Sequence, residues 1–304
     1  MTFARYNGIF AATVTPMKAN GDVAMDHIGP QIERLIERGV TGLYVCGSTG
    51  EGVSLTNAER KAVTVESIRA TAGRVPVLVQ VGHNSLAEAA ELATHAVVSG
   101  AAGVSATCPS YFKIGSVQVL VDSMKIVAEA ARDLPFYYYH IPSLTGNRIS
   151  MTEFLRLGSE AMPNLVGLKY SSPELYEYQQ CIELDGGRFE MMWGVDEMLI
   201  AALTVGGKAA VGSTYNVASP LYRRLITAFE QGDLAKARQH QSQAIAFISI
   251  VLGYPFQSAM KHILNWQGST AEAYCRMPQQ ELTLEQITSL HSRLAAIGFF
   301  DWCD

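Results

Sequence analysis

The stretch that decides the fold is NLVGLKYSS, residues 164–172. Its central part, residues 165–170, is almost continuously apolar, as expected of a parallel strand that is covered on both faces. Seven similar runs lie at residues 8–15, 42–46, 75–81, 103–107, 135–140, 189–194 and 208–212. Together these eight runs predict eight parallel strands.

Amphipathic segments separate the strands, as at residues 57–72, 86–99 and 117–132. Each of these three follows a residue suited to cap a helix N-terminus, namely Thr56, Ser85 and Ser116. Eight successive strand–helix units favour an α/β fold of the TIM (β/α)8 barrel type over a doubly wound open sheet.

The pattern after Gly212 is helical only, at residues 219–231, 234–252, 258–266 and 283–297. The first of these helices is expected to complete the barrel. The prediction is therefore a barrel over residues 1–231 and a C-terminal helical extension over residues 232–304, packed together as a single domain overall.

Composition excludes several classes of protein. Hydrophobic residues make up 48% of the 304 and charged residues 17%, which is typical of a globular chain with a sizeable core. The net charge of −5 and the absence of a Lys/Arg cluster exclude a general nucleic-acid binder. No apolar run long enough to span a membrane occurs, so no membrane partner is expected.

The five cysteines are scattered and lack a Cys-x-x-Cys pair. We interpret them as free thiols in a reducing compartment, and we expect a cytoplasmic location. They are Cys46, Cys108, Cys181, Cys275 and Cys303.

Functional groups of a TIM barrel lie at the C-terminal ends of the strands and in the loops that follow them. This rule selects a small set of positions: residues 47–51, Tyr111, Tyr139, His140, Lys169, residues 194–197 and residues 213–216.

Lys169 is the sharpest candidate because its side chain leaves a strand between apolar neighbours. A lysine turned towards a barrel interior loses hydration of its ammonium form, so its pKa falls and its amine can attack a carbonyl carbon. The alternative is a lysine whose ammonium group reaches solvent. Lys208 is a rival, but it stands at the start of its strand, which is the wrong end of the barrel.

Three further features bear on chemistry. Alternation puts Tyr137 and Tyr139 on one face of their strand, where Tyr139 either relays a proton or fills the core. The GSTGEG loop, residues 47–52, offers hydroxyls and backbone N–H groups to a carboxylate. Asp196 and Glu197 could bind a metal, but no histidine spacing supports such a site, so hydrogen bonds to polyol hydroxyls are the favoured role.

Five segments in this order together resemble the N-acetylneuraminate lyase and dihydrodipicolinate synthase superfamily of class I aldolases. The family's fold is the barrel expected above, and the resemblance covers residues 8 to 257. The segments are GSTGE (residues 47–51), YHIPSLTG (139–146), GLKYSS (167–172), GVDE (194–197) and GSTYN (212–216).

The resemblance implies a role for each matching position. Lys169 would form an imine with C2 of a 2-oxo acid, and Tyr139 would relay protons. Ser48 and Thr49 would bind the pyruvate carboxylate, with Ser48 assisting Tyr139. Tyr111 would complete the hydroxyl network. The remaining positions would contact substrate, with Ser171 standing where threonine is frequent: Ser171, Gly194, Asp196, Glu197 and Ser213.

Within the family, Leu144 resembles the lyase branch, because the synthase branch carries a carboxylate-binding arginine at this position. The resemblance thus implies cleavage of N-acetylneuraminate to N-acetylmannosamine and pyruvate by a homotetramer, without a metal or organic cofactor. His140 departs from the usual asparagine, which affects local hydrogen bonding.

Three alternatives stay open. Another pyruvate-dependent aldolase or dehydratase of the family would share Lys169 and Tyr139. It would differ in the aldehyde-side pocket, formed by Leu144, Asp196, Glu197, Ser213 and residues 254–257. The other two are a non-catalytic barrel that binds sugar acids and a metal-dependent class II aldolase.

Overall fold

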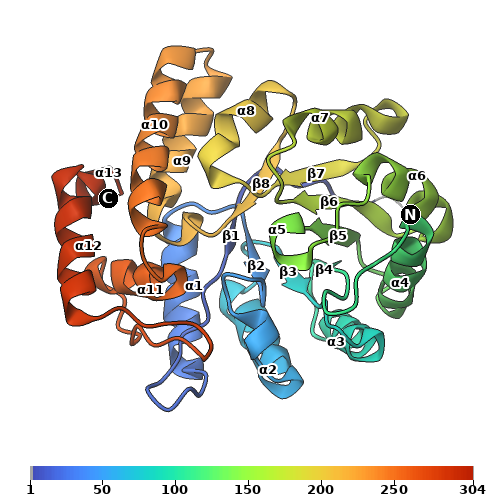
Figure 1. The fold of residues 1–304 in the computed structure, drawn as a ribbon, viewed down its shortest axis with the longest axis horizontal. Coiled ribbons are helices and arrows are strands. Elements are labelled where there is room, and N and C mark those ends of the chain that lie inside the picture. The colour runs from blue at the N-terminus through green and yellow to red at the C-terminus, as the bar shows by residue number, and fades with distance from the viewer. Residues whose placement is uncertain (1–2, 304) are drawn as a thin grey trace.

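The computed structural model describes residues 3–303. Its centre is a closed barrel of parallel strands that follow one another around the ring in sequence order, β1 to β8 (Figure 1). This confirms the predicted TIM barrel. The strands are β1 (Gly8–Ala12), β2 (Gly42–Val45), β3 (Val77–Gln80), β4 (Gly103–Ala106), β5 (Phe136–His140), β6 (Leu165–Tyr170), β7 (Glu190–Trp193) and β8 (Ala209–Gly212).

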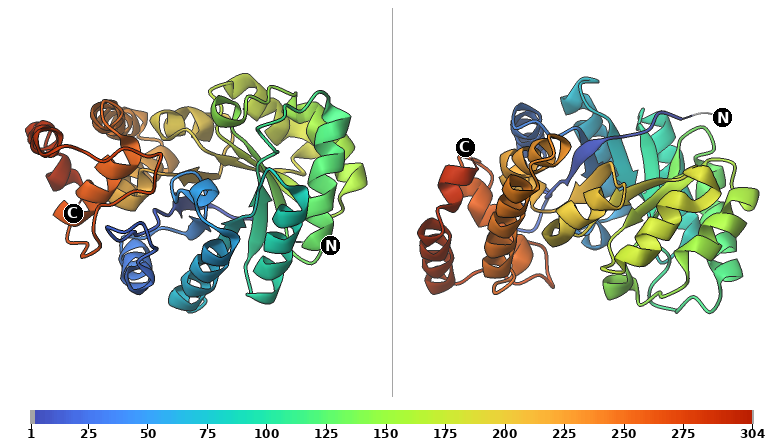
Figure 2. Two further views of the ribbon diagram at one scale, coloured as in Figure 1. Left: turned by 60° about the horizontal axis from the view of Figure 1, so that its bottom comes forward. Right: turned by 90° about the horizontal axis from the view of Figure 1, so that it is seen from above.

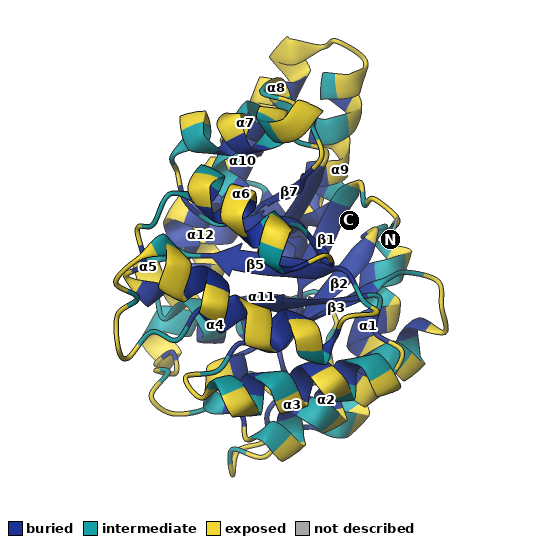
Figure 3. Ribbon diagram, turned by 90° about the vertical axis from the view of Figure 1, so that its right-hand side faces the viewer, coloured by how far each residue is buried: buried dark blue, intermediate teal, exposed yellow. Residues whose placement is uncertain are grey.

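Helices surround the barrel with their apolar sides inward, so that exposed residues lie on their outer faces (Figure 3). The predicted caps are confirmed, because the side chains of Thr56, Ser85 and Ser116 each accept a hydrogen bond from the backbone N–H three residues later. The helices around the first seven strands are α1 (Ile28–Glu37), α2 (Asn57–Thr71), α3 (Leu86–Val98), α4 (Val117–Ala130), α5 (Pro142–Thr145), α6 (Met151–Ala161), α7 (Leu175–Glu183) and α8 (Leu199–Thr204).

Four short 3-10 helices complete this part of the chain: η1 (Met25–His27), η2 (Gly52–Ser54), η3 (Leu184–Gly186) and η4 (Asp196–Met198). Two of them lie near the cavity described below, because η4 begins at Asp196, which lines it, and η2 follows the loop that carries Ser48 and Thr49. Each follows the C-terminal end of a strand, β2 or β7, where the barrel rule places functional groups.

The last barrel helix, α9 (Tyr215–Glu230), packs against β1 and so closes the outer ring. It starts four residues before the predicted position 219, because a kinked turn precedes its regular part. Ala218 has non-helical backbone angles (φ −130°, ψ 19°), and Pro220 follows it. The sequence pattern therefore showed only the portion beyond the kink.

The remaining helices form a layer on one side of the barrel (Figure 2). The helices α10 (Leu234–Val251) and α11 (Phe256–Trp266) pack on α9, while α12 (Leu284–Ala296) packs on α10 and α11. The short α13 (Phe299–Trp302) also contacts α9. Within residues 3–303, no single helix is both long and apolar enough to cross a membrane. The helices α10 and α11 are long and apolar enough only when they are taken together, and a bend of 117° separates them.

Alternation along β5 sorts its aromatic residues between two layers. Tyr137 and Tyr139 lie inside the barrel with Tyr44 of β2, whereas Tyr138 packs in the outer layer between strands and helices. This confirms the predicted arrangement. Tyr139 also stands beside Lys169 in the parallel ladder of β5 and β6, so both side chains leave the same face of the sheet.

Candidate active site

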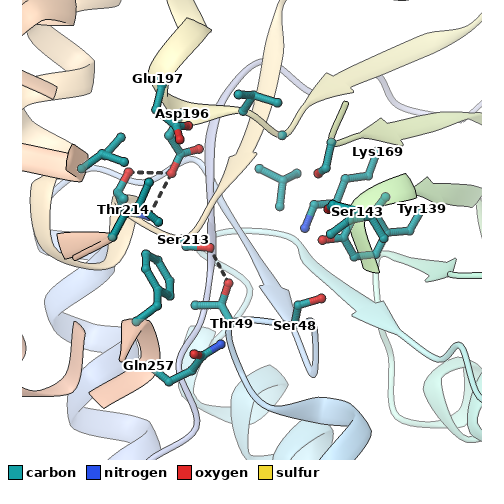
Figure 4. Close-up of a pocket in the computed structure, with 18 residues that line it drawn as sticks. Ser48, Thr49, Tyr139, Ser143, Lys169, Asp196, Glu197, Ser213, Thr214 and Gln257 are labelled. Atoms are coloured by element: carbon teal, nitrogen blue, oxygen red, sulfur yellow. Dashed lines mark hydrogen bonds between the residues drawn. The ribbon is translucent and has the colours of Figure 1, made fainter. Parts of the chain in front are cut away.

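A cavity of about 340 Å³ opens at the C-terminal ends of the strands, as the barrel rule predicts. Among the residues to which the family resemblance gives a catalytic or substrate-contacting role, all except Tyr111 line it: Ser48, Thr49, Tyr139, Lys169, Ser171, Gly194, Asp196, Glu197 and Ser213. Lys169 and Tyr139 lie on one side of this space and Asp196 and Glu197 on the other (Figure 4).

Lys169 is held inside the barrel, with only 4% of its surface exposed. Its Nζ lies 3.9 Å from the centre of the Tyr44 ring and 4.0 Å from the centre of the Tyr139 ring. Burial removes water from the ammonium form and lowers the pKa of Lys169. The lysine thus turns inward and does not reach solvent, whereas the rival Lys208 is exposed just before β8.

The GSTGE loop between β2 and η2 carries Ser48 and Thr49 to the cavity wall. Two non-glycine residues with left-handed backbone angles bracket the loop, Cys46 (φ 58°) and Glu51 (φ 54°), a conformation that surrounding contacts must maintain. The hydroxyl of Thr49 lies 2.6 Å from that of Ser213, so one hydrogen bond joins the loops after β2 and β8.

The end of this loop is anchored by the C-terminal part of the chain. Glu51 accepts a hydrogen bond from Lys261 Nζ at 2.6 Å and another from the backbone N–H of Arg276 at 2.8 Å. Lys261 also donates to the carbonyl oxygen of Tyr274 at 2.6 Å. The exposed fractions of the Glu51 and Lys261 side chains are 0% and 3%, so this is a buried ion pair with further hydrogen bonds.

Asp196 lies at the start of η4 and is buried against the loop after β8. Its Oδ2 accepts hydrogen bonds from Thr214, from the backbone N–H at 3.0 Å and from the hydroxyl at 2.5 Å. Its Oδ1 is buried without a hydrogen-bond partner, and a methyl group on Gly212 would collide with that oxygen. Burial raises the pKa of Asp196 to about 6.

Tyr111, to which the family resemblance gives a place in the hydroxyl network, does not line this chain's own cavity. Its side chain is 79% exposed, and its ring meets that of the equally exposed Phe112 edge-on, 5.1 Å between centres. Both aromatic residues follow β4 in a loop whose backbone N–H groups at Ser110 and Tyr111 donate to Asn84.

Two neighbours of Tyr139 also differ from expectation. His140 is buried in the outer layer beside Tyr138 and Tyr170, where desolvation lowers its pKa to about 4, so it does not face the cavity. Leu144 does not line the cavity either, because α5 directs it outward with 62% of its surface exposed. Ser143 lines the cavity instead.

Several lining residues were not predicted. Phe256 and Gln257 of α11 belong to the expected segment 254–257. Ile248 of α10 and Leu252, which follows that helix, were missed because nothing in a helix pattern shows which barrel opening the helix covers. Tyr44 does not line the cavity but lies beside Lys169, and it was also missed, although alternation along residues 42–46 could have placed it inside the barrel. The other unpredicted lining residues are Ile141, Ser143 and Val211, whereas Val195 and Thr214 lie within the predicted segments 194–197 and 213–216.

The arrangement of side chains does not support the alternative of a metal-dependent class II aldolase. Among residues 3–303, no three His, Cys, Asp or Glu side chains are placed to hold a metal ion together. All five cysteines are buried, and Cys46, Cys108, Cys181 and Cys275 are free thiols, as predicted.

The sequence and its fold also match known proteins. A model of the dihydrodipicolinate synthetase family matches residues 5–297, and the chain belongs to this family. The N-acetylneuraminate lyase of Rattus norvegicus is 37% identical over 98% of this chain and 94% of its own length. The structure of Proteus mirabilis N-acetylneuraminate lyase matches with a TM-score of 0.94 and 36% identity, over 97% of this chain and 100% of that one. The sialic acid aldolase of Aliivibrio salmonicida matches equally well, with a TM-score of 0.94 and 36% identity over 98% of both chains.

Proposed function

We propose that this chain is a class I aldolase that cleaves N-acetylneuraminate to N-acetylmannosamine and pyruvate through an imine on Lys169. The observation that carries the proposal is a desolvated lysine inside a cavity whose walls carry hydroxyls and carboxylates. Relatives with this activity in their names match nearly the whole chain, which supports the same chemistry here.

The first step needs a neutral amine and a fixed 2-oxo acid. Burial lowers the pKa of Lys169, so more of its amine is unprotonated at neutral pH than in water. Ser48 and Thr49 bind the substrate carboxylate through their hydroxyls and nearby backbone N–H groups. The amine attacks C2, and the hydroxyl formed there takes up a proton relayed from solvent by Tyr139 and leaves as water. A protonated imine then joins Nζ to the substrate.

The second step breaks the C3–C4 bond. The protonated imine accepts the electron pair of that bond and becomes an enamine, while Tyr139 accepts the proton of the C4 hydroxyl. N-acetylmannosamine leaves as the aldehyde. The enamine takes up a proton at C3, and water then hydrolyses the imine to release pyruvate and restore Lys169. Ser48 assists the proton transfer at Tyr139.

The opposite wall receives the sugar chain. Asp196 and Glu197 accept hydrogen bonds from its hydroxyls, and Ser213, Ser171 and the backbone at Gly194 add further contacts. The barrel itself requires the glycine, since a methyl group on Gly194 would collide with the Ser171 hydroxyl.

One observation supports a second candidate substrate. Leu144, which separates the lyase and synthase branches in the sequence, does not line the cavity. The choice of aldehyde therefore depends on the wall around Asp196 and on α10 and α11. Another sugar acid that releases pyruvate is the second candidate.

We also propose that the protein is a homotetramer in the cytoplasm. The exposed pair of Tyr111 and Phe112 supports an interface after β4. Tyr111 can join the hydroxyl network only at a neighbouring subunit's cavity if it keeps the position seen in this chain.

The test is to incubate the purified protein with N-acetylneuraminate in the presence of a chelator, add borohydride, and map the adduct by peptide mass spectrometry while measuring released pyruvate. An adduct on Lys169 together with pyruvate release is expected. An adduct with pyruvate alone would move the protein to the second candidate. No adduct with either compound, or an adduct at another lysine, would refute the Schiff-base function.

A further inference from the structure

The amine of Lys169 lies over two aromatic rings, that of Tyr139 and that of Tyr44 of β2. The centre of the Tyr44 ring is 3.9 Å from Nζ, and this ring meets that of Tyr139 edge-on, with 5.8 Å between centres and 80° between planes. The amine thus lies against two aromatic faces. A ring face attracts an ammonium group within about 6 Å of its centre.

Burial, a hydrogen bond and a close glycine hold the Tyr44 ring in place. It is fully buried, and its hydroxyl donates to the hydroxyl of Ser105 on β4 at 3.0 Å. Gly47 of the GSTGE loop lies against the ring edge, where a methyl group would approach ring carbons to 2.9 Å. One side chain therefore connects the lysine, the carboxylate loop and β4.

The hydroxyl of Tyr44 is not placed for proton transfer. It is committed to Ser105, and burial raises the pKa of Tyr44 well above its usual range. The face of the ring, not its oxygen, is directed at Lys169.

We infer that Tyr44 is a positioning residue that holds the Lys169 amine between its ring and that of Tyr139, and that supports the positive charge of the ammonium and iminium forms. This rests on the proposed function, in which Lys169 is the nucleophile. The ring face opposes the desolvation that lowers the lysine pKa, and it restricts the rotation of Nζ so that the amine faces the cavity.

Three variants distinguish the effect of the Tyr44 ring on Lys169 from a general loss of packing. Tyr44→Leu removes the face, and Tyr44→Phe keeps the face but removes the hydroxyl. The matched control is Tyr138→Leu, which removes another fully buried tyrosine, one whose hydroxyl accepts a hydrogen bond from Asn147, but on the outer face of β5. Both leucine variants replace a buried tyrosine with a smaller side chain and so leave a cavity. The control therefore reports the effect of lost packing alone.

The first readout needs no catalysis. Each protein is labelled with trace acetic anhydride between about pH 6 and pH 11, and acetylation of the Lys169 peptide is measured by mass spectrometry. Tyr44→Leu is expected to lower the apparent pKa of Lys169 by about one unit. Tyr44→Phe and Tyr138→Leu should leave it in place. An unchanged or raised pKa in Tyr44→Leu would overturn the inference, because the ring would then act only by excluding water.

The second readout is the rate of borohydride-trapped imine formation with pyruvate at the high-pH plateau, where the amine is unprotonated. Tyr44→Leu should be slower by about tenfold, whereas Tyr138→Leu should match the parent per folded molecule. Equal plateau rates would refute the positioning role. If the parent itself gave no adduct, the proposed function would fail, but the labelling result would still decide whether Tyr44 supports the lysine charge.

Discussion

The buried carboxyl of Asp196 should make the folded protein less stable as the pH rises through 6. Its pKa is about 6 in the folded chain, against an ordinary value of 3.8 that applies when the chain is unfolded. The folded state therefore binds this proton more tightly. The stability that the protonated form contributes is present in full below pH 3.8 and is lost as the pH rises through 6. A difference of about two pKa units corresponds to about 3 kcal/mol.

The perturbation is Asp196→Asn, which removes the titration and keeps the shape. The asparagine oxygen can take the place of Oδ2 and accept from Thr214, while its NH2 group occupies the site of Oδ1, which has no partner. An unpartnered buried donor costs about 1–3 kcal/mol. The variant should therefore be the less stable protein at pH 4 and should gain about 3 kcal/mol relative to the parent by pH 8.

The assay is urea unfolding of both proteins at equal concentration, at intervals from pH 4 to pH 8, followed by far-UV circular dichroism. Equal concentration is needed because subunit association adds to apparent stability. Glu190, at the other end of the barrel, has a pKa of about 7 and titrates nearby, but it is present in both proteins and cancels in the difference. Parallel pH profiles for parent and variant would refute the reasoning.

The same carboxyl predicts that N-acetylmannosamine binds the parent more tightly above pH 6 than below it.

Three further outcomes are expected. Tyr139→Phe should still form the trapped imine with pyruvate but cleave N-acetylneuraminate about 10²–10⁴-fold more slowly, and unimpaired cleavage would exclude a proton relay there. Lys261→Met should lower the free energy of unfolding by about 3–5 kcal/mol and weaken pyruvate binding, because it leaves the buried Glu51 without its cation. Adding Glu51→Gln should recover part of the stability, and simple additivity would show that the pair is not coupled. Inactive Tyr111→Ala and Lys169→Ala chains, denatured and refolded together, should regain aldolase activity if Tyr111 acts across subunits, and no recovery would count against that role.

The parts of this protein that the sequence predicted are those set by local pattern. Each barrel strand is covered on both faces and is therefore apolar throughout, and the barrel rule then selects the residue at its end. Lys169 satisfied both conditions, since it stands near the end of β6 among apolar neighbours. The prediction that Tyr137 and Tyr139 share one face likewise needed only the two-residue period of a strand.

The parts that could not be predicted depend on contacts between distant segments. Tyr44 reaches Lys169 across the barrel interior, and no spacing along the chain relates β2 to β6. Leu144 follows the family pattern in sequence, yet the direction of its side chain depends on how the short helix α5 turns after β5. Tyr111 carries no local signal of whether it serves its own cavity or another surface.

The anchor of the carboxylate loop has a consequence for the order in which the enzyme becomes functional during synthesis. Glu51 and Lys261 are 210 residues apart, although they share a buried ion pair. A nascent chain contains β2, the loop and Lys169 long before Lys261 leaves the ribosome, and contacts of such long sequence separation form late in folding. Until then the loop lacks its anchor. Under the proposed function, competence to capture a 2-oxo acid therefore waits for the segment from Lys261 to Arg276, and binding of pyruvate reports that this segment has joined the barrel.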